Sequence, residues 1–231
     1  MLQNRAHVRS EYLFEGRRFA AFLFDMDGTV LNSIGVAERV WGAWAQRQGL
    51  DVAAFLPTVH GVRSVDTIRR LSLPGIDPEL EAQAISKAEM EDIVGIVSIE
   101  GAETLLASLP PRRWAIVTSA PRALAVRRIQ AAGLPVPHVL IAAEDVSRGK
   151  PAPDCYQLAA QRLGVDAQAC LVFEDATAGI ASAEAAGASV VVISATHAIE
   201  TTHITLAGYH HSRVVADDEG LALVQTESSS A

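Results

Sequence analysis

The sequence predicts an α/β fold in which a doubly wound, Rossmann-like parallel sheet core carries an inserted helical cap domain. Short continuous apolar runs recur along the chain, which is typical of strands that are buried on both faces. Helical patterns that end in a glycine lie between the later runs. The interval 35–100 lacks strand-like runs and shows three or four helical stretches instead.

The predicted core alternates strands with helices. The strands are expected in the apolar runs Phe19 to Phe24, Trp114 to Val117, Val139 to Ala143, Cys170 to Phe173 and Val190 to Ile193. The helices are expected at Pro121 to Ala132, Asp154 to Leu163 and Thr177 to Ala186, followed by Gly133, Gly164 and Gly187. This alternation indicates a parallel sheet with helices on both faces. We therefore assign 19–34 and 101–225 to the core, with 1–18 and 226–231 as terminal extensions and Arg213 to Ala216 as an edge strand.

The helical interval 35–100 is the predicted cap domain. Apolar residues recur there at helical spacing, in the sets Val36, Val40 and Trp44, then Ile68 and Leu71, then Leu80, Ala84, Ile85 and Ala88. We expect Trp41 and Trp44 to be packing residues, as large aromatic side chains commonly are. A helical block that follows the first strand can cover the carboxyl edge of the sheet, where ligands bind in such folds.

Composition excludes several classes of protein. Hydrophobic residues make up 49% and charged residues 20%, so disordered and fibrous classes are excluded. The net charge of −8 argues against a nucleic-acid partner. No apolar run approaches the roughly 18 residues that span a bilayer, and no signal-peptide pattern is evident. We expect no membrane partner, a cytoplasmic monomer or weak homodimer, and reduced thiols at Cys155 and Cys170.

Two acidic pairs stand at the ends of predicted strands. Asp25 and Asp27 follow the first strand, and their i, i+2 spacing directs both side chains to one side. Gly28 then permits a tight turn. Glu174 and Asp175 follow a later strand, and the two pairs meet at one edge if these strands are neighbours. Carboxylates gathered in this way repel one another unless a cation neutralises them, and Mg²⁺ suits an all-oxygen site.

Two further segments carry groups that suit a phosphate. Thr118 and Ser119 follow a third strand, where their hydroxyls can bind phosphate oxygens or cap the next helix. Lys150 stands in a proline-rich loop ahead of a helix, as a point charge for a phosphoryl group. The loop is not a P-loop, because no Ser or Thr follows the lysine.

These four segments, in this order, resemble the motifs of the haloacid dehalogenase superfamily of aspartyl-nucleophile phosphohydrolases. The resemblance covers about Phe22 to Ile193. It extends into the cap, where the stretches 36–41 and 60–63 are similar to those of bacterial sugar phosphatases and of the glycerol phosphate and 2-deoxyglucose-6-phosphate phosphatases. One departure is Asn32, where the family often has an acidic residue; we expect it to cap the following helix.

The resemblance implies a function and a role for each motif residue. The function is Mg²⁺-dependent hydrolysis of phosphate monoesters of small sugars or polyols through an aspartyl-phosphate. Asp25 is expected as the nucleophile and Asp27 as the general acid and base. The implied metal ligands are Asp25, Asp27 (mainly through its backbone carbonyl), Glu174 and Asp175. Thr118, Ser119 and Lys150 are expected to bind the phosphoryl group.

Substrate choice is expected to reside in the cap. His60 and Arg63 are the candidates for contact with the substrate's hydroxyls or phosphate, whereas the other histidines, including His210 and His211, are expected to be solvent-exposed. A sugar phosphomutase of the β-phosphoglucomutase type and a catalytically silent phosphometabolite-binding module remain alternatives. A dehalogenase is disfavoured, because it has no use for Asp27 or for the second acidic pair.

Overall fold

A six-stranded parallel sheet forms the centre of the molecule, whose computed structural model describes residues 10–226. The strand order is β6-β5-β2-β7-β8-β9. The strands are β2 (Ala21–Phe24), β5 (Trp114–Val117), β6 (Val139–Ile141), β7 (Cys170–Glu174), β8 (Ser189–Ile193) and β9 (Ile204–Leu206). All five predicted strands are present, and β2 lies between β5 and β7 as the convergence of the acidic pairs requires. The short edge strand β9 was not predicted.

Helices cover both faces of this sheet. Phe22 and Phe24 of β2 face one hydrophobic core and Leu23 faces the other, as the twofold alternation of strand side chains dictates. Besides Val36 of the helical insertion, which joins the core on the Phe22 face, two helices contribute apolar side chains to each core. On the Phe22 face they are α5 (Ala102–Ser108) and α6 (Arg122–Ala131), and on the Leu23 face they are α7 (Asp154–Leu163) and α8 (Thr177–Ala185). The doubly wound core is therefore confirmed.

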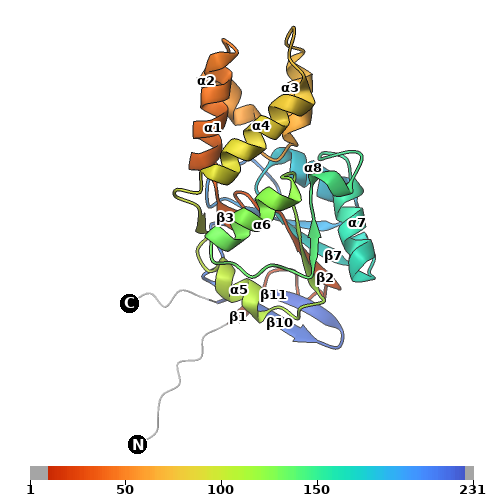
Figure 1. Cartoon of the computed structure of the whole chain (residues 1–231). Coiled ribbons are helices and arrows are strands. Elements are labelled where there is room, and N and C mark those ends of the chain that lie inside the picture. Colours follow the sequence, from red (N-terminus) through yellow and green to blue (C-terminus); the bar gives the residue numbers. More distant parts are fainter. Residues whose placement is uncertain (1–9, 227–231) are drawn as a thin grey trace, which may run out of the picture.

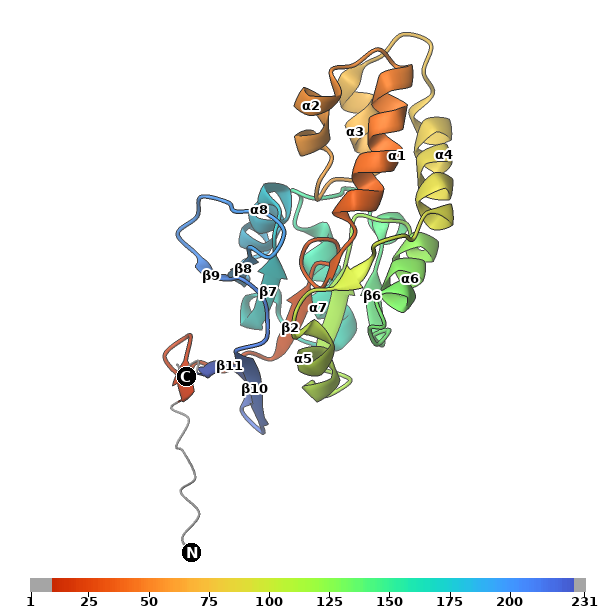
Figure 2. The ribbon, with the colours of Figure 1, turned by 90° about the vertical axis from the view of Figure 1, so that its left-hand side faces the viewer.

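A helical block stands above the carboxyl edge of the sheet (Figures 1 and 2). Its helices are α1 (Ile34–Arg47), α2 (Val52–Phe55), a 3₁₀ turn (Leu56–Thr58), α3 (Ser64–Leu71) and α4 (Pro78–Glu91). The block has its own hydrophobic core, in which Trp41, Trp44 and Phe55 pack together. The expected apolar face of α4 is only partly buried, because Ile85 points inward while Leu80 is 63% exposed.

The expectation that 35–100 contains no strand is wrong in one place. β4 (Val97–Ser98) pairs antiparallel with β3 (Leu31–Asn32), so the two connections between the helical block and the core run side by side. A two-residue strand is too short to produce an alternating pattern. Asn32 Oδ1 accepts a hydrogen bond from the Ile34 backbone N–H (3.1 Å), but the N-cap of α1 is Ser33, so Asn32 precedes the cap instead of forming it.

A small antiparallel sheet lies at the end of the molecule away from the helical block (Figure 1). Its order is β1 (Ser10–Tyr12), β11 (Gly220–Thr226) and β10 (Ser212–Asp217). The predicted edge strand is thus β10, but it borders this second sheet rather than the central one. Residues 10–12, expected as part of the N-terminal extension, pair in it with residues 224–226 of β11, of which only 226 was expected as part of an extension.

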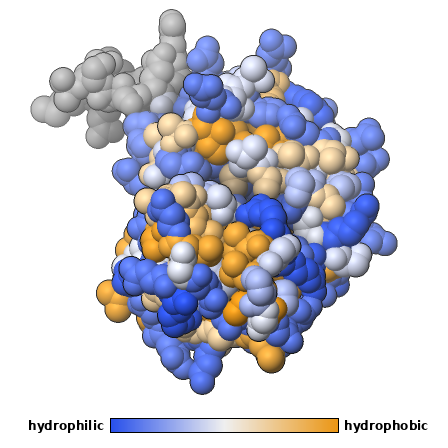
Figure 3. All heavy atoms as spheres, turned by 90° about the horizontal axis from the view of Figure 1, so that it is seen from above, coloured by the Kyte–Doolittle hydropathy of each residue, from blue (hydrophilic) through white to orange (hydrophobic). Residues whose placement is uncertain are grey.

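The face of the molecule that carries the helical block is mixed in character. Figure 3, which looks down on the helical block, shows small apolar groups among hydrophilic side chains. Within residues 10–226 no helix has both the length and the apolar character needed to cross a membrane.

Candidate active site

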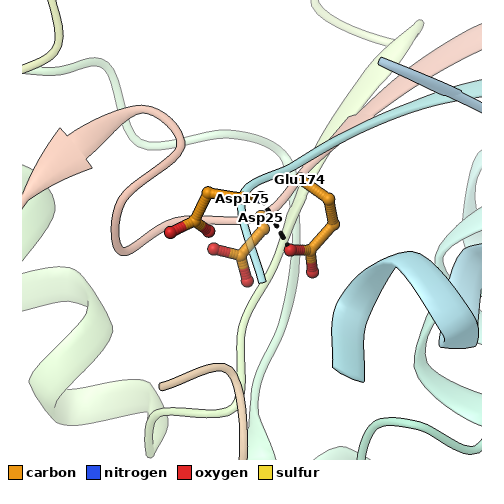
Figure 4. Close-up of side chains that lie close together, drawn as sticks. All are labelled: Asp25, Glu174 and Asp175. Atoms are coloured by element: carbon orange, nitrogen blue, oxygen red, sulfur yellow. Dashed lines mark hydrogen bonds between the residues drawn. The ribbon is translucent and has the colours of Figure 1, made fainter. Parts of the chain in front are cut away.

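Three carboxylates meet where β2 and β7 end. Phe24 and Phe173 are register partners in these parallel strands, so Asp25 emerges beside Glu174 and Asp175. One carboxylate oxygen of each residue lies within 4.8 Å of the others, and all three side chains are buried. In Figure 4 the Asp25 carboxylate lies between those of Asp175 and Glu174. The predicted convergence of the strand-end acids is therefore observed for these three side chains.

Lys150 is the cation inside this cluster. Its Nζ donates to Asp25 Oδ1 (2.5 Å) and to Glu174 Oε1 (2.6 Å), and its side chain is 1% exposed. The same Glu174 oxygen accepts from the Tyr156 hydroxyl (2.8 Å). The other oxygen accepts from the backbone N–H groups of Asp175 (2.9 Å) and Ala176 (3.0 Å). Glu174 thus fixes the position of Lys150 and of the loop that carries Asp175.

The cluster has three carboxyl groups and one cationic side chain. Burial raises the pKa of Asp25 to about 8, although Lys150 acts to lower it. Burial, with the neighbouring Asp25 and Glu174, also raises the pKa of Asp175 well above its ordinary value. Burial lowers the pKa of Lys150, but Asp25 and Glu174 raise it well above the ordinary value for lysine. One lysine among three buried carboxylates leaves a need for further positive charge, so the site fits a divalent cation with oxygen ligands.

The turn after β2 brings the backbone close to Asp175. Gly28 has φ +87°, and a Cβ there would lie 1.9 Å from Asp175 Oδ2, so only glycine fits. The next residue, Thr29, donates its hydroxyl to Asp175 Oδ1 (3.0 Å), and Tyr209 donates to the Thr29 carbonyl (3.0 Å). The turn thereby orients the Asp175 carboxylate.

Asp27 lies outside the three-carboxylate cluster. Its Oδ1 accepts from the Ser33 hydroxyl (2.6 Å) and from Arg128 Nη1 (3.0 Å), and its side chain is 29% exposed. Arg128 in turn forms an ion pair with Glu89 of α4. The side chain of Asp27 is therefore separate from the group of carboxylates that suits a cation.

A cavity of about 80 Å³ lies between the carboxyl edge and the helical block. Asp25, Asp27 and Asp175 line it from the core. So do Thr118 and Ser119, which follow β5 as predicted. The Thr118 hydroxyl accepts from the Ala120 N–H (3.0 Å), and the Ser119 hydroxyl donates to the Gly61 carbonyl of the helical block (3.0 Å).

The two predicted substrate-binding residues lie in different places. His60 lines the cavity, and burial lowers the pKa of its imidazole. Arg63 is not among the residues that line it. Its guanidinium donates to Asp66 (2.6 Å) and to the carbonyls of Val146 (3.1 Å) and Ser147 (3.2 Å), on the loop that leads to Lys150.

Sequence reasoning missed four residues around the site: Glu89, Arg128, Tyr156 and His197. Arg128 and Glu89 are charged residues on the buried faces of their helices, next to Ile129 and four residues after Ile85. A charge on an apolar helix face is a signal that the sequence did contain.

The expectation that the other histidines are solvent-exposed is wrong for several of them. His197 is half-buried, and its Nδ1 lies 3.9 Å from Asp175 Oδ2. His203 is half-buried against Glu184 (2.9 Å), and His211 is half-buried as well. His138 and His210 are exposed, and His7 lies outside the described residues. His197 follows β8. Its position after a strand of the parallel sheet is therefore the same kind of signal that predicted the acidic pairs.

Comparison with known proteins identifies the family. The profile of the haloacid dehalogenase-like hydrolases matches residues 19–187. The chain belongs to this family. It is 40% identical over 182 residues to hexitol phosphatase A of Escherichia coli, which covers 77% of this chain and 84% of that protein. It is 33% identical over 197 residues to 2-deoxyglucose-6-phosphate phosphatase 2 of Saccharomyces cerevisiae, with 76% and 80% covered.

The fold of this haloacid dehalogenase-like hydrolase is also found in solved structures. A hydrolase from Pseudomonas syringae superimposes with a TM-score of 0.72 and 23% identity, over 81% of this chain and 93% of the other. The sheet, the helical insertion and the strand-end carboxylates thus stand in a chain whose relatives are phosphatases.

Proposed function

We propose that this chain hydrolyses phosphate monoesters of small sugars or polyols, in a Mg²⁺-dependent reaction with an aspartyl-phosphate intermediate. The observation that carries the proposal is the buried contact of Asp25 with Lys150 beside Glu174 and Asp175. This contact holds a carboxylate nucleophile next to a cation that suits phosphoryl oxygens. The names of the relatives, a hexitol phosphatase and a sugar phosphate phosphatase, support the substrate class.

In the first step, a carboxylate oxygen of Asp25 attacks phosphorus and the sugar oxygen leaves. Asp27 lines the same cavity and donates a proton to that oxygen. Lys150 and the hydroxyls of Thr118 and Ser119 bind the phosphoryl oxygens, which carry most of the charge in such transition states. In the second step, Asp27 removes a proton from the water that hydrolyses the aspartyl-phosphate.

Mg²⁺ would be held by Asp25 and Asp175 together with the backbone carbonyl of Asp27, and when bound it supplies positive charge for the carboxylates and the phosphoryl group. Glu174 contributes negative charge to the same site. Because four hydrogen-bond donors already engage its two oxygens, its main contribution is to hold Lys150 and Asp175 in place.

Substrate selection is assigned to the helical block. His60 lines the cavity from the helical block, so we assign it to contact with the sugar or polyol. Arg63 uses three of its five N–H donors on Asp66, Val146 and Ser147, so contact with the substrate would come from the remaining two. We further propose a cytoplasmic monomer or weak homodimer with no nucleic-acid partner, in keeping with the net charge of −8 and two buried free thiols.

The test is release of inorganic phosphate from a panel of sugar and polyol phosphates, with and without Mg²⁺, using Asp25→Asn as the blank. Metal-dependent release from a few hexose, pentose or polyol phosphates supports the proposal. An isomerised sugar phosphate without release identifies a mutase instead. Failure to turn over any member of the panel favours a binding module.

A further inference from the structure

We propose that Arg128 is a positioning residue that couples the docking of the helical block to the orientation of Asp27. The guanidinium stands between Asp27 in the core and Glu89 on α4 of the helical block. The inference rests on the proposed function only in taking Asp27 as the proton donor to the leaving oxygen.

The contact of Arg128 with Asp27 is the first half of a bridge from Asp27 through Arg128 to Glu89, and it holds one oxygen of Asp27. Arg128 Nη1 and the Ser33 hydroxyl both donate to Oδ1, at 3.0 and 2.6 Å. Within residues 10–226 no hydrogen bond reaches the other oxygen, Oδ2. Because two donors fix Oδ1, the rotation of the carboxyl is set, and Oδ2 stays available to the leaving group in the cavity that Asp27 lines.

The second half of the bridge crosses from core to helical block. Arg128 Nη2 lies 3.1 Å from Glu89 Oε1 in an ion-pair contact, where α4 packs against α6. The side chains of both residues are nearly fully buried, at 5% and 6% exposed. The geometry of this contact is not that of a hydrogen bond, and neither Nε nor Nη2 of Arg128 has a hydrogen-bond partner.

The charges make the two halves interdependent. A buried guanidinium needs negative charge nearby, which Asp27 and Glu89 provide together. Without Arg128 the two carboxylates face each other as like charges across the boundary between core and helical block. Docking of α4 therefore completes the environment that holds Asp27, and withdrawal of α4 removes one of the two counter-charges of Arg128.

The test compares Arg128→Met with Arg128→Lys and with Arg127→Met, which removes an exposed arginine from the same helix. Single-turnover reactions measure only the first step, as release of sugar from a sugar phosphate and of p-nitrophenol from p-nitrophenyl phosphate. The p-nitrophenolate ion leaves without protonation, so its release does not depend on a positioned acid. A parallel hydrogen-exchange measurement follows the amides of residues 78–91 and needs no substrate.

Arg128→Met should slow sugar release by about 10²-fold or more, a typical contribution of general acid catalysis. It should slow p-nitrophenol release by less than about fivefold, because p-nitrophenolate leaves without a proton from Asp27. Amide exchange in residues 78–91 should increase, Arg128→Lys should recover much of the sugar release, and Arg127→Met should match the wild type. Equal losses on both substrates, no loss, or unchanged exchange in α4 would overturn the inference. A wild type that releases p-nitrophenol but no sugar contradicts the proposed function, and the exchange measurement then decides the inference alone.

Discussion

Lys150 is the residue on which the candidate site depends most heavily. It is the only lysine or arginine with hydrogen bonds to Asp25 or Glu174 in the described part of the chain, and it is nearly inaccessible to water. Its role was expected from the sequence, but its contact with Glu174 was not, because the partner of a buried lysine depends on the packing of α7 against the sheet. The contact of Tyr156 with Glu174 escaped notice for the same reason.

Replacement of Lys150 by Met should lower the free energy of unfolding by about 3 to 5 kcal/mol, the usual cost of leaving a buried charge without its partner. Three buried carboxylates would then lie together with no cation from the chain. Urea unfolding of the metal-free protein measures the effect. Lys87→Met, at an exposed position on α4, is the control and should change stability little. A loss below about 1 kcal/mol for Lys150→Met would contradict this account of the cluster.

Asp25 gives the metal-free protein a characteristic pH dependence. Its pKa is raised to about 8 in the folded state, so between pH 4 and 8 the folded chain keeps a proton that the unfolded chain has lost. Stability is therefore fully present below the unfolded pKa and declines as pH rises toward 8. The proposed Mg²⁺ would bind the ionised carboxylate, so its stabilising effect should grow over the same range.

Melting temperatures at pH 5, 6.5 and 8, with and without Mg²⁺, measure both effects. Asp25→Asn lacks the titrating group, so the difference between it and the wild type reports the titration of Asp25 together with its effect on Asp175. A difference that does not change with pH in the absence of metal would rule out the proposed titration.

At the scale of elements, glycines set how closely the loops and helices approach the site. Gly179 in α8 packs on Glu174, and a Cβ there would lie 1.6 Å from Oε1. Gly42 in α1 is also helical, but its Cβ would meet Val52 at an ordinary 3.7 Å. The same substitution should therefore have opposite effects at these two positions.

Gly179→Ala should destabilise the protein and lower turnover at least tenfold, because Glu174 must move and Lys150 with it. Gly42→Ala should be neutral or stabilise by up to about 1 kcal/mol, since alanine favours the helix. Thermal unfolding and steady-state kinetics of the two variants provide the comparison. Equal stability and turnover in the two variants would show that the approach of α8 to Glu174 is not critical.

The elements that could be predicted are those with strong local signals. The strands β2, β5, β7 and β8 are continuous apolar runs, and Gly164 ends α7 with φ +73° as its position indicated. β4 was missed because it has only two residues, and β9 because Thr205 interrupts its apolar residues. The partners of β10 were missed because nothing local indicates which strand it joins. Arg128 and Glu89 meet only through the packing of α4 on α6, and sequence spacing within one helix does not show such a contact.

At the scale of the whole molecule, the helical block closes the site. The cavity of about 80 Å³ is smaller than the ~300 Å³ at the lower end of small-molecule sites, so we expect the block to move away when a sugar phosphate binds. The paired connections β3 and β4 are the places where such a movement can occur. The sequence predicted a lid over the carboxyl edge, but the extent of closure follows from tertiary packing.

Amides in α1 and α4 should therefore exchange more slowly when Mg²⁺ and orthovanadate are added, because a phosphate-like ligand in the cavity favours the closed arrangement. Amides in β10 and β11, at the far end of the molecule, serve as an internal control and should not change. Equal protection of both regions would indicate general stabilisation rather than closure of the helical block.

The most direct test of the central claim is to locate the covalent intermediate. The enzyme is mixed with Mg²⁺ and a sugar phosphate that it turns over, quenched in acid, digested, and analysed by mass spectrometry. The account predicts phosphate on Asp25 in the wild type, and a folded Asp25→Asn variant with neither the modification nor turnover. Phosphate on another residue, or phosphate release by Asp25→Asn at a rate near that of the wild type, would contradict it.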